Sequence, residues 1–136
     1  MDLNRSALDL FALPAFEVVA LSAGVCADSI PADSDQAIFL LCPILGPSST
    51  MILHRLSRYA SHSSTTWSPM EFGRTFGLSV NGTGLAVTAV VRLAKFGFVV
   101  IGSDHLAVRT TVPPLPTKWL DSLPSYLRPD PSSAAA

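Results

Sequence analysis

Cysteine, charge and long hydrophobic runs are all scarce in this chain of 136 residues. Its two cysteines, Cys26 and Cys42, are too few for a disulfide framework. Fifteen residues lie between them, whereas zinc ligands usually come in closely spaced pairs. We therefore expect a reduced, intracellular protein without a bound metal. Only 14% of the residues are charged and 49% are apolar, which suits a packed core and excludes disorder over most of the length.

No segment has the length and composition of a transmembrane helix. The most apolar stretch near the start, residues 11–26, contains Pro14 and Glu17 and is shorter than the roughly 20 residues that a span needs. It is also a poor signal peptide, because Asp2 and Asp9 spoil the positively charged start that such peptides have. We expect a cytoplasmic protein with no membrane partner.

The net charge of −1 hides two parts of opposite sign. Residues 1–50 hold one base and six acids, whereas residues 51–112 hold six bases and two acids. A surface that meets nucleic-acid phosphates would lie in the second part, although its excess of positive charge is modest. The bases of this part are Arg55, Arg58, Arg74, Arg92, Lys95 and Arg109.

The first part of the chain predicts strands and a loop. Residues 16–21 (FEVVAL) are apolar and β-branched, which favours a strand. Residues 29–35 (SIPADSD) predict a loop, because proline and aspartate break regular structure. Residues 36–45 (QAIFLLCPIL) predict a buried strand. Pro43 indicates that the end of this strand lies at a sheet edge. We assign residues 1–35 to an acidic N-terminal extension that adds a strand or two to the sheet of the following domain.

Two helix starts follow in the sequence. Residues 46–49 (GPSS) predict a helix that begins at a proline, is capped by a serine hydroxyl and runs to about His62. Residues 68–71 (SPME) contain a serine cap, a proline at the first helical position and a capping-box glutamate. Gly77 is placed to end this second helix.

A third helix and a hairpin complete the pattern. Thr83 can cap a helix over residues 84–96, which Gly97 ends, and its inner stripe consists of Ala86, Ala89, Val90 and Leu93. Residues 98–101 and 105–109 are two β-rich runs around a tight loop with a glycine, which predicts a hairpin. Residues 117–127 predict a short C-terminal helix interrupted by proline, followed by a disordered tail.

The order helix, helix, tight turn, helix, hairpin predicts an α+β, mainly helical fold. It is the order of a winged helix-turn-helix, with three helices and a β-hairpin wing. We assign residues 36–116 to this domain and residues 117–136 to the short helix and tail.

Five segments resemble those of uncharacterised actinobacterial winged-helix regulators and cover about half of the chain. They are LGPSST (45–50), FGLS (76–79), VVRLAKFGFV (90–99), DHLAVR (104–109) and VPPLP (112–116). The resemblance implies a transcriptional regulator or an architectural protein that binds double-stranded DNA. We expect it to act as a homodimer, because two half-sites multiply a modest affinity.

A winged helix reads DNA through its third helix, which lies in the major groove, with the hairpin as its wing. Thr88, Arg92 and Lys95 share one face of the expected third helix. Other candidates precede this helix or flank it, where side chains meet bases or phosphates. They are Ser79, Asn81 and Thr83 in the turn and first helical turn, Arg74 on the second helix and Arg109 on the wing.

Plainer interpretations of these residues remain open. Arg92 and Lys95 could be solvated charges on a helix face. The middle of the expected recognition face is apolar or small, which suits a protein partner better than DNA. It contains Gly84, Leu85, Val87 and Val91. A second interpretation is therefore a non-enzymatic protein–protein interaction or dimerisation module built on a winged helix.

We expect no enzyme activity, cofactor or metal. Residues 103–105 (SDH) contain the residue types of a catalytic triad, but neighbours on a hairpin cannot converge as triad members do. Residues 81–84 (NGTG) lack the lysine and the preceding strand of a phosphate-binding loop. His54 and His62 have no carboxylate or cysteine at a ligand spacing.

Overall fold

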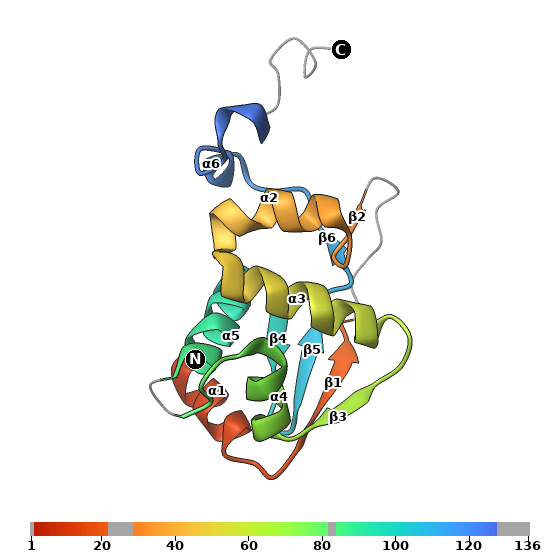
Figure 1. Cartoon of the computed structure of the whole chain (residues 1–136), viewed down its shortest axis with the longest axis vertical. Coiled ribbons are helices and arrows are strands. Elements are labelled where there is room, and N and C mark those ends of the chain that lie inside the picture. The colour runs from red at the N-terminus through yellow and green to blue at the C-terminus, as the bar shows by residue number, and fades with distance from the viewer. Residues whose placement is uncertain (1, 22–28, 82–83, 128–136) are drawn as a thin grey trace.

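The computed structural model describes residues 2–21, 29–81 and 84–127, which form an α+β fold. The helices are α1 (Leu3–Phe11), α2 (Asp35–Leu45), α3 (Pro47–Ala60), α4 (Pro69–Phe76), α5 (Leu85–Lys95) and α6 (Thr117–Leu120). The strands are β1 (Phe16–Ala20), β2 (Ile30–Pro31), β3 (Thr65–Trp67), β4 (Val99–Ile101), β5 (His105–Val108) and β6 (Thr111–Val112). In Figure 1 the larger sheet lies behind α3 and α4, and α2 and α6 lie beyond α3, away from that sheet.

The larger sheet has the strand order β3-β1-β5-β4. Strand β1 pairs antiparallel with β3, where Phe16 lies opposite Trp67, and parallel with β5, where Val18 lies opposite Leu106. Strands β4 and β5 form an antiparallel hairpin. The strand predicted at residues 16–21 and the predicted hairpin are therefore confirmed, and the N-terminal strand does join the sheet of the hairpin. A separate two-residue ladder joins β2 to β6.

The strand predicted at residues 36–45 is wrong, because this segment is helix α2. The helix begins after Ser34, whose hydroxyl oxygen accepts a hydrogen bond from the N–H of Ala37 at 3.2 Å. Pro43 lies in the last turn and removes one intrahelical hydrogen bond there. Packing against α3 offsets that loss, since the α2 residues buried at helical spacing are Ala37, Leu41 and Leu45. The loop predicted just before α2 contains the short strand β2.

Helix α4 confirms the capping prediction, whereas α3 starts differently. The hydroxyl oxygen of Ser68 accepts from the N–H of Glu71 at 3.1 Å, and Gly77 ends α4 in the left-handed region at φ +66°. The N-cap of α3 is Gly46, and no side chain caps that helix. Either Ser48 or Ser49 was expected to cap it, and the Ser49 hydroxyl instead donates to the carbonyl of Ala89 in α5 at 3.0 Å.

The predicted third helix is present as α5 and ends before Gly97, whose φ is +81°. Its expected cap, Thr83, lies outside the described residues; the N-cap position is occupied by Gly84, and no described side chain caps the helix. The short C-terminal helix is found as α6 and a 3-10 turn over Ser125–Leu127, separated at Pro124. The tail expected to be disordered, residues 128–136, also lies outside the described residues.

A single hydrophobic cluster holds these elements together and extends from Ala7 in α1 to Val112 in β6. Phe72 of α4 lies at its aromatic centre, with ring centroids 5.2 Å from Phe11 and 5.9 Å from Phe16. Helix α1, which was not predicted, packs on α5 and on β4. The N-terminal segment therefore contributes to the core as well as to the sheet.

Candidate functional site

The outward face of α5 is a narrow, mostly polar stripe. Leu85, Thr88, Arg92 and Lys95 are exposed, and most of the other residues of the helix are buried. The structure thus brings three of the predicted DNA-binding residues, Thr88, Arg92 and Lys95, onto one exposed face, as their spacing predicted. Val87 and Val91, which the sequence placed on the recognition face, are buried.

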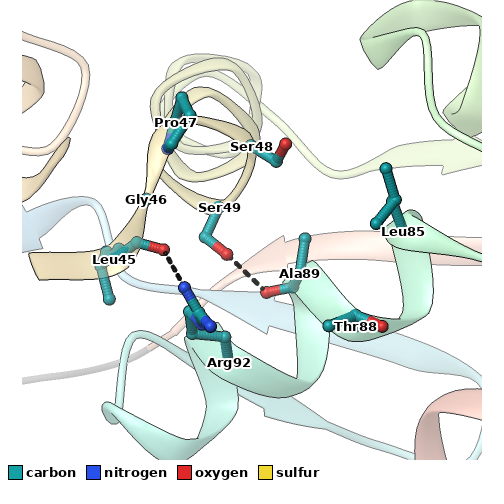
Figure 2. Close-up of a pocket in the computed structure, with 9 residues that line it drawn as sticks. All are labelled: Leu45, Gly46, Pro47, Ser48, Ser49, Leu85, Thr88, Ala89 and Arg92. Atoms are coloured by element: carbon teal, nitrogen blue, oxygen red, sulfur yellow. Dashed lines mark hydrogen bonds between the residues drawn. The ribbon is translucent and has the colours of Figure 1, made fainter.

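Two hollows border this stripe. One has a volume of about 190 Å³ and lies between the start of α3 and residues Leu85, Thr88, Ala89 and Arg92 of α5 (Figure 2). The other, of about 410 Å³, lies between Asn4 of α1 and the same face of α5. Helix α5 is therefore bordered by α1 and by α3. A DNA-reading helix, in contrast, must enter a major groove about 8.5 Å deep.

Arg92 binds the end of α2. Its Nη1 donates a hydrogen bond to the carbonyl oxygen of Leu45 at 3.1 Å (Figure 2). This carbonyl belongs to the last turn of α2, where free backbone carbonyls favour a cation. Gly46 leaves room for the guanidinium, because a Cβ at that position would lie 3.3 Å from Nη1. Arg92 thus holds the corner between α2 and α3 against α5, and no local pattern in the sequence indicated this contact.

The other described residues that were predicted to contact DNA do not extend the α5 stripe. Arg74, Ser79 and Asn81 line a separate hollow of about 350 Å³ beside α4. The Arg74 guanidinium lies 3.7 Å from the carboxylate of Glu71 on the same helix. Arg109 is half-buried, and its Nε donates to the carbonyl of Thr111 at 3.3 Å. Both arginines are therefore engaged within the chain.

The tip of the hairpin carries an acid. The Asp104 side chain is 81% exposed, and its Oδ1 lies 3.0 Å from Nδ1 of His105. The His105 ring lies over Gly102, where a Cβ would collide with it. The hairpin tip and α5 therefore do not share one positive face, which is the property that a DNA-binding winged helix would need.

Helix α2 leaves part of its apolar sequence exposed or half-buried. Of its eleven residues, three are buried, and Phe39 is 65% exposed. Gln36 and Pro43 are exposed on the same side, three residues before Phe39 and four after it. Next to Phe39, Leu40 lines an apolar hollow of about 260 Å³, together with residues 112–115 and strand β2. We call this region, Gln36, Phe39, Leu40, Pro43 and residues 112–115, the α2 surface.

The sequence did not indicate the α2 surface because residues 36–45 were interpreted as a buried strand. The signal that could have revealed it is Ser34 followed by Asp35, a cap and a first-turn acid at the start of an apolar run. When nine consecutive apolar residues form a helix, some of them must be exposed, because a helix on the outside of a domain buries only one stripe.

Within residues 2–21, 29–81 and 84–127, no group of three or more His, Cys, Asp or Glu side chains could hold a metal ion. None of the helices in this part of the chain combines the length and the apolar composition needed to cross a bilayer.

Comparison of the chain with protein-family models, with curated proteins and with solved structures finds no match.

Proposed function

We propose that this chain is a non-enzymatic protein-association module built on a winged helix. The element order α3, β3, α4, α5, β4, β5 supports the winged helix, since three helices precede an antiparallel hairpin. Strand β1 is an addition to this arrangement, because it lies between β3 and β5 in the sheet.

The observation that carries the proposal is an exposed aromatic side chain on α2 with an apolar hollow beside it. Phe39 is 65% exposed in a helix that is apolar at every position from Ala37 to Leu45. Exposed apolar patches on a folded chain mark interaction sites, and aromatic side chains beside a pocket are the residues that contribute most to association. The hollow beside Leu40 supplies such a pocket.

DNA binding is the second candidate, and the Thr88, Arg92 and Lys95 stripe favours it. Affinity for duplex DNA grows with the number of bases that neutralise phosphates. This stripe offers Lys95 and those N–H groups of Arg92 that do not bind Leu45. The wing adds Asp104, which repels phosphate. The charges therefore favour the association module over the DNA-binding protein.

A salt-dependent gel shift with mixed genomic DNA fragments tests this choice. The proposal expects no shift by the wild-type chain at low salt. The opposite result would be a shift that is lost in an Arg92→Ala/Lys95→Ala double variant and kept in an Arg55→Ala/Arg58→Ala control on α3. That pattern would overturn the proposal in favour of DNA binding, provided that far-UV circular dichroism shows both variants to be folded.

A further inference from the structure

We infer that the partner of the α2 surface is a second copy of this chain, packed so that the two α2 helices run antiparallel about a two-fold axis. This inference rests on the proposed function, because it names the partner of the same surface. Three features of the surface support it: its shape, its charge and its size.

The shape of the α2 surface suits contact with an identical surface. It carries an apolar projection, Phe39, and beside it an apolar hollow lined by Leu40 and residues 112–115. A two-fold interface uses the same patch on both copies. If residue i of one copy contacts residue j of the other, then residue j of the first copy contacts residue i of the second. In such a dimer Phe39 of each copy enters the hollow of the other copy.

The charges at the two ends of α2 favour the antiparallel direction. Asp35 lies in the first turn, and the guanidinium of Arg92 lies at the last carbonyl, Leu45. In an antiparallel pair each Asp35 approaches the end of the other helix that holds Arg92, whereas a parallel pair would bring like charges together. The helix dipoles are also opposed in the antiparallel pair, which is favourable.

The size of the surface indicates a reversible dimer. A helix of eleven residues is about 16 Å long and, with its side chains, about 10 Å wide. A standard interface buries about 800 Å² on each partner, more than the outward side of one such helix provides. Residues 112–115 must therefore add to the contact, and we expect association that depends on concentration in the micromolar range.

Sedimentation velocity over a range of protein concentrations tests the inference. The wild-type chain is expected to shift from monomer to dimer, and Phe39→Asp is expected to weaken this association at least tenfold. Leu85→Asp is the matched control, because Leu85 is 62% exposed and an acid is tolerated at the start of α5. Phe39 is exposed in the single chain, so Phe39→Asp should keep the wild-type melting temperature at concentrations where the wild-type chain is monomeric.

The direction of packing is tested by cross-linking. In a Cys26→Ser/Cys42→Ser background, Gln36→Cys and Pro43→Cys each place one thiol near an end of the α2 surface. Because an antiparallel pair sets position 36 opposite position 43, a mixture of the two variants should form a disulfide-linked dimer on mild oxidation. Each variant alone should form much less.

Three results would each overturn a different statement. A wild-type chain that stays monomeric at all concentrations rules out the second copy as partner, while the proposed association module stands. A dimer that Leu85→Asp dissociates and Phe39→Asp does not would place the interface on α5. A DNA shift that needs Arg92 and Lys95 would overturn the proposed function, whatever sedimentation shows.

Discussion

At the scale of single residues, two polar contacts fix α5 against the helices that precede it. Ser49 is 2% exposed, and its hydroxyl donates to the carbonyl of Ala89, 40 positions later. Arg92 reaches back to the carbonyl of Leu45, 47 positions earlier. The buried Ser49 hydroxyl would cost free energy if it lacked a partner, whereas the exposed Arg92 contributes a charge-assisted hydrogen bond to the end of α2. These two contacts therefore help to set how α5 lies against α2 and α3.

The Ser49 contact leads to a stability prediction. We expect Ser49→Ala to lower the free energy of unfolding by about 1 kcal/mol, because one buried hydrogen bond between helices is lost. Urea denaturation followed by circular dichroism measures this change. Ser48→Ala, on the same turn but half-buried, should change the free energy by less than about 0.5 kcal/mol. Equal losses in the two variants would show that the Ser49 hydroxyl has no special role.

Local spacing predicted part of the candidate site. The helical repeat alone places Thr88, Arg92 and Lys95 on one face of α5, and in the structure that face is exposed. The contact between Arg92 and Leu45 could not be predicted in this way. It depends on how α2 and α5 pack together, and nothing near Arg92 in the sequence encodes that packing.

At the scale of the elements, α4 and the turn after it approach each other closely. Gly73 is buried in α4, and a Cβ at this position would lie 2.6 Å from the carbonyl oxygen of Leu78 and 3.0 Å from Cγ1 of Val80. The N–H of Leu78 in turn donates to the carbonyl of Gly73 at 2.9 Å. The turn between α4 and α5 can therefore fold back only because residue 73 has no side chain.

This close approach reverses the usual effect of replacing glycine in a helix. Gly→Ala inside a helix normally stabilises it by about 1 kcal/mol. We expect Gly73→Ala to destabilise the chain by at least about 2 kcal/mol instead, because the clash is with backbone. Thermal unfolding measures the difference, with the exposed Thr75→Ala on the same helix as control. An increase in melting temperature for Gly73→Ala would contradict the packing described here.

Helices could be predicted from the sequence where nearby residues mark their first and last turns. The start and end of α4 and the end of α5 were predicted from a capping serine, a proline and two glycines, and they are confirmed. Helix α5 starts after Gly84 and not after the expected cap Thr83, which lies outside the described residues. Helix α2 was missed because its apolar run lacks a 3.6-residue pattern and contains Pro43, and packing on α3 outweighs both. Helix α1 was missed although Asp2 caps it by accepting from the N–H of Arg5 at 3.2 Å.

At the scale of the whole molecule, the N-terminal segment lies inside the fold. Strand β1 lies between β3 and β5, and Ala7, Leu10 and Phe16 belong to the main core cluster. Strand β1 thus separates β3 from the β4–β5 hairpin. Residues 36–116, the domain expected from the sequence, would therefore lack a central strand of their sheet.

A truncated chain tests this dependence. We expect a chain that starts at Gln36 to be unfolded, because β3 and β5 lose their shared partner and the core loses four large side chains. Those side chains are Leu10, Phe11, Phe16 and Val18. Proton–nitrogen correlation NMR spectra report folding, and a chain that ends at Leu127 should keep the wild-type spectrum. Dispersed peaks from the Gln36 variant would instead show that residues 36–116 fold alone.

The central place of β1 has a consequence for synthesis on the ribosome. Glu17 pairs with Thr66 on one side and with His105 on the other. Because the N-terminus emerges first, β1 can join β3 well before β5 has been made. Until then the nascent chain presents an open strand edge, which is a template for pairing with other nascent chains. Slow translation between Trp67 and His105 should therefore increase aggregation of this protein more than slow translation after Val108.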